Sequence, residues 1–287
     1  MNKYFFLWAV AALTLSSCSD DDEPTAERYP LTIAVSENPL LDEAGNPVTT
    51  TRGTVITTGT LASFYANYQD TKYTATKSSE GTWSTSPSYW PFGVEKSTMI
   101  DFYAYSAGTF NNESSPYVSF TVDENVSAQN DLLVAHRNVS YNETGGKVWL
   151  TFDHACAAVD FQIQITNTLR TKLGGDLKVN SITLQGIANK GEYHYGEGWK
   201  SLSVTDSPPK YSLNNSEMDI STTPTAANNG TLFMIPQTLG DNAKLVVNYK
   251  KSSNVEAKTA EISLKGRTWE AGKQYIVTIK LGTGLIK

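Results

Sequence analysis

The stretch VWLTFDHACAAVDFQIQI, residues 148–165, contains two runs in which apolar and polar side chains alternate. The first run places Val148, Leu150 and Phe152 on one side of an extended chain. The second run has apolar side chains at every second position: Val159, Phe161, Ile163 and Ile165. A repeat of two residues is typical of a β-strand that is buried on one face. The stretch therefore predicts two consecutive strands.

The same repeat continues along the rest of the chain, and no segment after the first 17 residues shows a convincing 3.6-residue repeat. Alternating runs occur in LTIAV (31–35), MIDFYAY (99–105), YVSFTV (117–122), AKLVVNY (243–249) and YIVTIKL (275–281). Turn-forming residues separate these runs. Roughly a dozen short strands with frequent turns predict an all-β protein made of β-sandwiches.

The length of 287 residues is sufficient for one large domain or two ordinary ones, and we favour two. The polar stretch NVSYNETGG, residues 138–146, is our preferred boundary, and the loop around Gly174 and Gly175 is the second candidate. We therefore expect an N-terminal β-sandwich over residues 29–144 and a C-terminal one over residues 145–287.

The N-terminus begins with an apolar run, YFFLWAVAALTL (4–15), that is too short to span a bilayer as a helix. It is typical of a secretory signal. The end of this run and the three residues after it, LSSC (15–18), resemble the lipobox of bacterial lipoproteins and predict a signal peptide over residues 1–17 with lipidation of Cys18. Plain secretion with an incidental cysteine is the alternative.

After Cys18 and Ser19 come four acidic residues, Asp20, Asp21, Asp22 and Glu23. A block of like charges stays solvated and extended, so residues 18–28 are expected to form an acidic tether. The block also resembles the export signal that directs some lipoproteins to the outer leaflet of the outer membrane. The alternative is a linker whose only property is solubility.

Composition excludes several classes of function. The chain is 39% hydrophobic and 18% charged, as expected for a globular protein, and its net charge of −6 argues against nucleic acid as a partner. With Cys18 assigned to lipid, Cys156 has no cysteine to pair with, and its apolar surroundings indicate a buried side chain.

The sequence offers little that would support catalysis. His154 and Cys156 lie two positions apart, but no further ligands for zinc and no orienting group for a Cys–His nucleophile can be identified. His136 and His194 lie in separate strand-like runs. We expect no enzyme activity, no cofactor and no metal. The six tryptophans and fifteen tyrosines leave a sugar-binding face as an alternative function, and Trp149 is predicted to point away from the core.

An ordered set of short segments after the lipobox resembles the fimbrillin family of surface lipoproteins. The segments are Thr51-Arg52, WSTSPSYWPFG (83–93), DFYAYS (101–106), DLLVAH (131–136), VWLTFDHACAAVDFQI (148–163), LFMIPQTL (232–239) and RTWEAGKQYIVTIKL (267–281). The resemblance extends from about Tyr29 to Leu281. It implies two transthyretin-like β-sandwich domains and a subunit of fimbriae, the surface filaments used for adhesion.

The resemblance also implies a route of assembly. An outer-membrane-anchored precursor at the cell surface would be cleaved between Arg52 and Gly53, which would release the strand that carries Leu31, Ile33 and Val35. A strand from another fimbrial subunit would then fill the vacated groove, by donor-strand exchange. The candidate donor is the C-terminal strand with Tyr275, Val277, Ile279 and Leu281.

Two alternatives stay open at this point. Arg52 is equally well interpreted as an ordinary loop arginine. Only GTGLIK follows Leu281, which is short for an extra strand, so an anchor, terminator or tip position and a stand-alone surface lipoprotein all remain open. Expected partners are other fimbrial subunits, the outer membrane, and glycans or proteins of host or bacterial surfaces. The rival to the fimbrial reading is an outer-surface glycan-binding lipoprotein.

Overall fold

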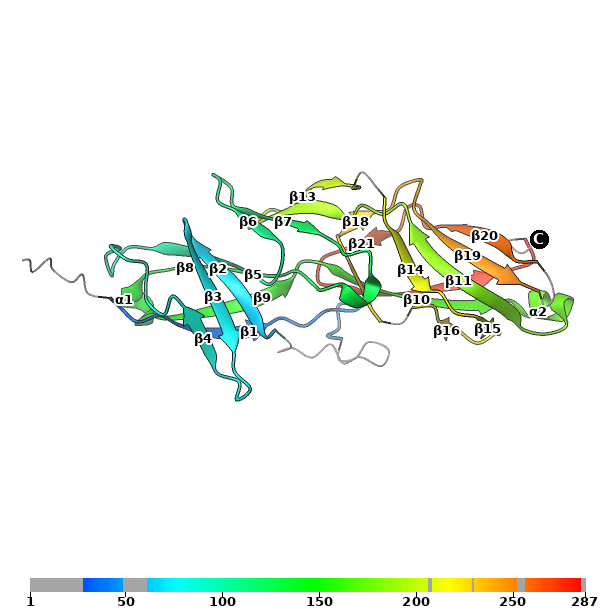
Figure 1. Ribbon diagram of the computed structural model, residues 1–287, viewed down its shortest axis with the longest axis horizontal. Coiled ribbons are helices and arrows are strands. Elements are labelled where there is room, and N and C mark those ends of the chain that lie inside the picture. The colour runs from blue at the N-terminus through cyan, green and yellow to red at the C-terminus, as the bar shows by residue number, and fades with distance from the viewer. Residues whose placement is uncertain (1–27, 49–60, 206–207, 229, 252–255, 285–287) are drawn as a thin grey trace, which may run out of the picture.

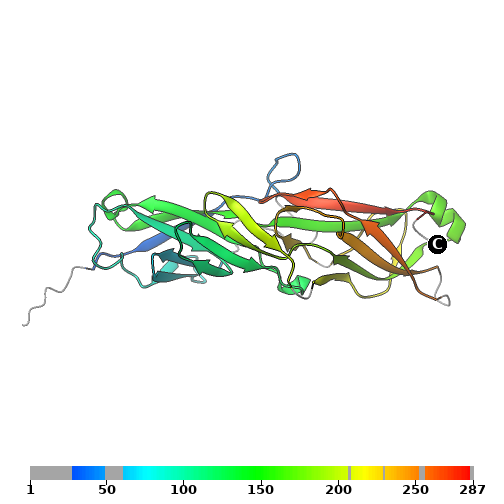
Figure 2. The same cartoon turned by 90° about the horizontal axis from the view of Figure 1, so that it is seen from above.

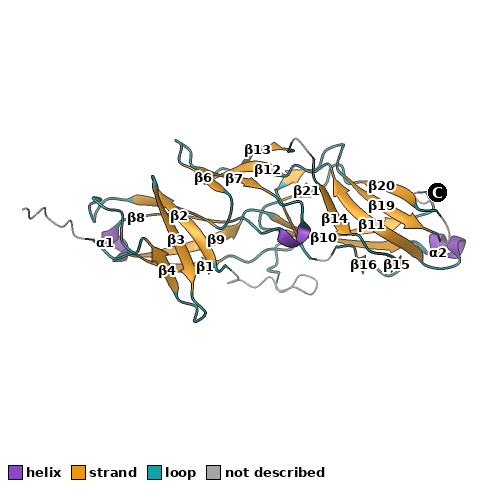
Figure 3. Ribbon diagram, viewed as in Figure 1, coloured by secondary structure: helices purple, strands orange, loops and turns teal. Residues whose placement is uncertain are grey.

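The computed structural model describes residues 28–48, 61–205, 208–228, 230–251 and 256–284. These residues form an elongated molecule in which the first described residues and the C-terminal end lie at opposite ends (Figure 1). Almost all of the regular structure is β-strand, and the helices are short (Figure 3). The prediction of an all-β fold is therefore confirmed.

The largest sheet contains seven strands in the order β1, β9, β8, β5, β2, β3, β4. Their bounds, in that order, are Thr32–Glu37, Lys147–His154, Leu133–Val139, Ile100–Tyr105, Ser63–Tyr68, Thr71–Lys77 and Trp83–Ser86. Most neighbours are antiparallel, but β1 runs parallel to β9. One inner face of this sheet packs into a hydrophobic core that includes Ile33, Phe64, Phe102, Val148 and Phe152.

Two further sheets contribute to a second core. One contains β16 (Thr225–Ala226), β10 (Ala157–Ile165), β17 (Leu232–Met234) and β22 (Gln274–Leu281), with β22 parallel to β10. The other contains β14 (Lys210–Asn214), β15 (Met218–Ile220), β11 (Leu177–Gln185), β19 (Lys244–Lys250) and β20 (Lys258–Ser263). Their buried side chains, among them Phe161, Leu184 and Val247, share one cluster, as expected for a sandwich.

A four-stranded sheet lies along one side of the molecule. It contains β13 (Gly198–Ser203), β12 (Lys190–His194), β7 (Tyr117–Thr121) and β6 (Thr109–Asn111), and a small pair joins β18 (Gln237–Thr238) to β21 (Thr268–Trp269). The helical segments are α1 (Tyr141–Thr144), α2 (Asn167–Leu173) and the 3-10 turn η1 (Val126–Ala128).

The strands β9 and β10 follow each other directly and belong to different cores. Side chains of β9, such as Leu150, pack in the first core, whereas those of β10, such as Phe161, pack in the second. The chain therefore passes from one core to the other near Ala155 and Cys156. The domain boundary expected between residues 144 and 145 remains a prediction.

The polar stretch that suggested the earlier boundary forms a tight connection from β8 to β9 within one sheet. Ser140 caps α1 in a capping box with Glu143, and Gly145 ends the helix in the left-handed conformation. Polar capping residues and glycines are common both in tight turns and in domain linkers. Composition alone therefore does not distinguish this turn from a linker.

Candidate functional site

The strand β1 lies at the border of the first sheet. It pairs in parallel with β9 from Thr32 opposite Lys147 to Glu37 opposite Phe152, and β9 is its one strand partner within the described part of the chain. Leu31 and Ile33 are buried in the first core, and Val35 is half-buried against it. Leu31 lies just before the strand, whereas Ile33 and Val35 lie within it. The alternating run thus forms a peripheral strand whose inner side chains complete a core.

The entrance to β1 is bonded on its other side. The N–H of Leu31 donates to the carbonyl of Ser88 (3.0 Å), the N–H of Trp90 donates to the carbonyl of Tyr29 (2.7 Å), and Pro30 bridges Tyr89. These bonds hold the first residues of the described chain between β9 and the loop after β4. The strand is therefore fixed at its start by neighbours on both sides.

The chain after β1 continues along the second core. Leu40 is almost fully buried, and the N–H of Leu41 donates to the carbonyl of Gly272 (2.8 Å). The N–H of Gln274 in turn donates to the carbonyl of Leu41 (2.7 Å). Segment 29–41 therefore contacts the first sheet and then the start of β22, and it joins the two cores.

The strand β22 borders β10 as β1 borders β9. Its parallel register runs from Gln274 opposite Ala158 to Leu281 opposite Ile165. Val277, Ile279 and Leu281 are buried, Tyr275 is half-buried, and Ile276 on the opposite face is 50% exposed. The predicted donor strand thus exists as a strand, and it fills a place in the sandwich of its own chain.

A buried carboxylate fixes the start of β22. Asp160 of β10 is 2% exposed and accepts hydrogen bonds from Gln274 Nε2 (2.8 Å), Thr231 Oγ1 (3.1 Å) and Asn228 Nδ2 (3.3 Å). All three donors are neutral side chains. Sequence reasoning missed Asp160, because a carboxylate in an apolar strand gives no indication of the loop that will cover it.

Three predicted site residues lie outside the described residues. These are the lipidation residue Cys18 and the two residues of the candidate cleavage bond, Arg52 and Gly53. The described chain resumes at Leu61, which is buried in the first core. Lipidation and cleavage therefore remain predictions.

The residues His154 and Cys156 meet around Asp131. The Nδ1 atom of His154 lies 2.5 Å from Asp131 Oδ2, and the N–H of Cys156 donates to Asp131 Oδ1 (3.3 Å). Burial opposes the charged imidazole, but the hydrogen bond and charge of Asp131 outweigh burial and raise the pKa of His154. Burial raises the pKa of the Cys156 thiol well above its usual range. A buried protonated thiol at the crossing between two cores is structural, not nucleophilic.

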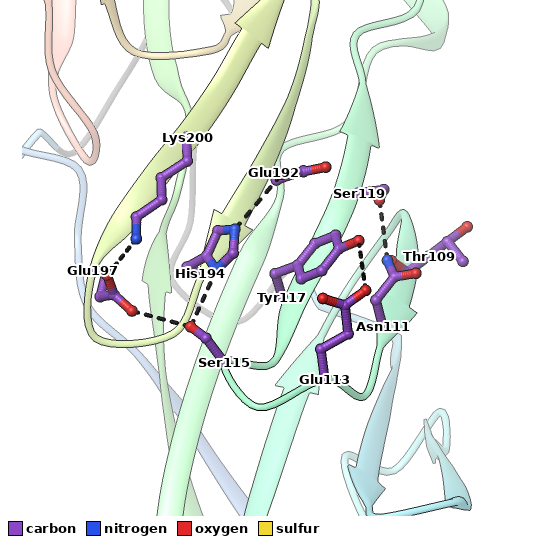
Figure 4. Close-up of polar contacts among 10 residues, drawn as sticks. All are labelled: Thr109, Asn111, Glu113, Ser115, Tyr117, Ser119, Glu192, His194, Glu197 and Lys200. Carbon is purple, nitrogen blue, oxygen red and sulfur yellow. Dashed lines mark hydrogen bonds and ion pairs between the residues drawn. The ribbon is translucent and has the colours of Figure 1, made fainter.

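The outer face of the four-stranded sheet carries a second polar cluster (Figure 4). The hydroxyl of Ser115 lies 3.2 Å from His194 Nδ1 and donates to Glu197 (3.0 Å), which also pairs with Lys200. These hydrogen bonds lower the pKa of Glu197, with Lys200 as the main cause. The ring of Tyr117 stacks on His194, with centroids 4.8 Å apart. The groups bind one another across neighbouring strands, so this arrangement is a polar sheet face rather than an activated nucleophile.

Two further observations limit the functions available to the described residues. No group of three His, Cys, Asp or Glu side chains among them is placed to hold a metal ion. In the same residues, no helix is long and apolar enough to cross a membrane. The surface does expose Trp149, as predicted, with 59% of the residue accessible and Lys147 Nζ 4.6 Å from its ring centroid.

Comparison with known proteins gives a consistent result. A family model described as fimbrillin-like matches residues 45–287. A fimbrial protein from Bacteroides vulgatus is similar in structure, with a TM-score of 0.52 at 18% identity over 89% of this chain and 96% of that one. A protein assigned to cell adhesion from Bacteroides uniformis has a TM-score of 0.53 at 13% identity, over 92% of this chain and 96% of that one.

A third similar structure is a protein assigned to cell adhesion from Parabacteroides distasonis, with a TM-score of 0.55 at 10% identity over 88% of each chain. At these identities the solved structures support the fold alone. The search of curated proteins found no match.

Proposed function

The chain belongs to the fimbrillin-like family, and we propose that it is a structural and adhesive subunit of cell-surface fimbriae. The family consists of structural surface proteins rather than enzymes. The surface location of such a subunit agrees with the signal peptide and lipobox expected at residues 1–18. Lipidation of Cys18 would hold the precursor in the outer membrane, because two or three acyl chains anchor a protein that one chain would release.

The observation that carries the proposal is the position of β1 at the border of its sheet. Cleavage after Arg52 would free residues up to 52, a length that contains all of β1 and the segment bonded to Gly272 and Gln274. The loss would leave the β9 edge without its six-residue partner and would open the places of Leu31, Ile33 and Leu40. Burying one such side chain contributes roughly 1.5–3 kcal/mol, so the open groove favours strand addition by another subunit.

The C-terminal strand is the candidate donor, and its packing bears on the position of this subunit. Three of its side chains, Val277, Ile279 and Leu281, already fill the second core of the same chain. Donating them to a neighbour would open the donor's own sandwich. This asymmetry supports a subunit that accepts a strand more readily than it donates one, as an anchor or terminal subunit would.

An arginine-specific protease tests both steps. The purified protein should be trimmed at Arg52 and then form oligomers that persist in detergent on heating. Arg52→Ala is the matched control and should stay intact at this bond and monomeric. Complete trimming that leaves only monomer would contradict strand exchange. Cys18→Ala tests the anchor, since retention of this variant in the membrane fraction would contradict lipidation.

The exposed ring of Trp149 favours a second candidate function, binding of surface glycans. A flat aromatic side chain that is 59% exposed can stack on a sugar ring. Elsewhere on the surface, a hollow of about 640 Å³, within the size range of small-ligand sites, is lined by apolar residues such as Pro209 and by polar ones such as Lys244 and Glu261. Tryptophan fluorescence titrated with a panel of polysaccharides tests this function. A Trp149→Ala variant that keeps the full signal would exclude Trp149 as the platform.

A further inference from the structure

Two large apolar side chains project from the end of the molecule at which the described chain begins. Phe92 is 65% exposed and Met99 is 48% exposed, and both lie on the loop between β4 and β5. This loop, residues 91–99, lies beside α1, because the N–H of Asn142 donates to the carbonyl of Lys96 (2.9 Å). Figure 1 shows α1 at the end opposite to the C-terminus. Both side chains belong to one loop, and exposed apolar side chains of this size often mark a contact surface.

The loop is anchored to the first core by a buried aromatic side chain. Trp90, which precedes Phe92 by two residues, is almost fully buried, and its ring packs against Phe102 (5.4 Å between centroids) and Tyr141 (5.6 Å). Between Phe92 and Met99, the ammonium of Lys96 lies 4.1 Å from the ring centroid of Tyr29. Phe92 and Met99 are therefore presented on a supported surface.

The chain enters the fold at this same end. The guanidinium of Arg28 lies 4.7 Å from the ring centroid of Tyr89, and Pro30 pairs with Tyr89. Nine residues, 19–27, separate Arg28 from Cys18 in the sequence. Since a residue spans at most about 3.3–3.6 Å, the lipid proposed at Cys18 would keep this end within roughly 35 Å of the membrane. Such confinement raises the effective concentration of the end at the bilayer surface.

We propose that the end carrying Phe92 and Met99 is a lipid-contacting surface that rests on the bilayer while the precursor is anchored. The inference rests on the proposed lipid anchor. Apolar side chains suit the boundary between headgroups and acyl chains, and Arg28 and Lys96 can reach lipid phosphates beside them. Acidic residues near this end include Glu95 on the loop and Glu143, which is occupied in capping Ser140 (2.9 Å). Four more, Asp20, Asp21, Asp22 and Glu23, precede Arg28 in the expected tether. Because positive and negative side chains lie at the same end, their effects on membrane binding largely cancel. Binding then depends mainly on the apolar side chains and changes little with salt concentration.

A spin label placed next to these residues tests the contact. The chain from Ser19 to Lys287, with a histidine tag in place of the acylated cysteine, is bound to phosphatidylcholine vesicles that contain a nickel-chelating lipid. A nitroxide is attached at Thr98→Cys in a Cys156→Ala background. We expect the label to become more accessible to oxygen and less accessible to aqueous chromium oxalate when the vesicles are added. A label at Ile276→Cys, also exposed but on β22, is the control and should not change.

The variant Phe92→Ser/Met99→Ser should abolish the protection of the label at residue 98. Equal exposure of the labels at 98 and 276 on vesicles would overturn the proposal. Protection that appears without vesicles and rises with protein concentration would also overturn it, because it would indicate contact between two copies of the chain.

The tag replaces the acyl chains, so this experiment gives an answer even if Cys18 is not lipidated. A second outcome separates the two proposals in the opposite way. If membrane association depends on Cys18 but the label at residue 98 stays in water, the lipid anchor is supported and the lipid-contacting surface is overturned.

Discussion

The backbone N–H of Gln274 donates a hydrogen bond to the carbonyl oxygen of Leu41, and its side chain donates to the carboxylate of Asp160. One residue at the start of β22 thus joins the segment that follows β1 to the interior of the second core. Removal of the N-terminal segment would break the first of these bonds. Cleavage at Arg52, as proposed, is therefore expected to change the second core as well as the first.

The side-chain bond of Gln274 should make a measurable contribution to stability. In Gln274→Leu, the buried Asp160 loses one of its three neutral donors, and the variant is expected to lose about 1–3 kcal/mol of unfolding free energy. Urea denaturation measures the change. Thr278→Val is the matched control: it removes an exposed hydrogen bond to Gln162 on the same strand and should alter stability by less than about 0.5 kcal/mol. Equal losses in both variants would contradict this account of Asp160.

The substitution Ile33→Ala should destabilise the uncleaved protein. The side chain is 7% exposed in the first core, and truncation of a buried isoleucine costs roughly 2–5 kcal/mol. Ser36→Ala, on the outer face of the same strand, is expected to have little effect. After complete cleavage at Arg52 and release of the segment, wild-type and Ile33→Ala proteins should unfold at the same urea concentration. A difference that survives cleavage would show that β1 remains bound.

Stability should depend on pH through His154. The pKa of His154 is raised in the folded state above its ordinary value of 6.5, so the folded protein holds this proton more tightly than the unfolded chain. The stabilising contribution of the ion pair with Asp131 is present in mildly acidic solution, where His154 is protonated and Asp131 is ionised, and it is lost as the pH rises through the folded-state pKa of His154. Burial raises the pKa of Asp131 above its ordinary value of 3.8, so the ion pair is also lost in stronger acid.

His154→Gln is therefore expected to cost roughly 3–5 kcal/mol of unfolding free energy in mildly acidic solution, where the buried pair is ionised, and to cost less as the pH rises. Urea titrations across this range measure the effect. His136→Gln, which removes an exposed pair with Asp101, is the matched control. A cost of His154→Gln that grows with pH would contradict the assignment.

The thiol of Cys156 should be unreactive in the folded protein. It is completely buried, and burial, with the charge of Asp131 adding to it, raises its pKa well above the usual range. In a Cys18→Ala protein, iodoacetamide at neutral pH is expected to label Cys156 slowly under native conditions and quickly in urea, as followed by mass spectrometry. Rapid native labelling would show that the crossing between the two cores opens in solution.

Alternation in the sequence located the main strands because a half-buried strand must alternate. The runs at 31–35, 99–105 and 275–281 correspond to β1, β5 and β22, and no end differs by more than two residues. Alternation does not identify partners, so the parallel pairing of β1 with β9 had no signal in the sequence. The sequence also predicted that Ile33 and Val277 face a core, but it did not indicate that Val277 fills the core of its own chain.

Other features were missed for identifiable reasons. The helix α2 has only seven residues, too few for a helical repeat, although Thr166 as N-cap and Gly174 as a left-handed C-cap are recognisable signals. Asp131 lies 23 residues before His154, and only the fold brings their side chains together. The sequence alone therefore could not identify Asp131 as the hydrogen-bond partner of His154.

The consecutive strands β9 and β10 carry β1 and β22 as parallel partners, and this arrangement has a mechanical consequence. The chain enters at one end of the elongated body and leaves at the other, and the first and last strands each run parallel to their partner (Figure 2). Tension along the long axis, between a membrane and an adhering surface, would load β1 against β9 and β22 against β10 in shear. In shear, all hydrogen bonds between two paired strands carry the force together. Sequential rupture, in which the hydrogen bonds between two strands break one after another, would need far less force. The parallel arrangement of the outer strands along the long axis disfavours sequential rupture.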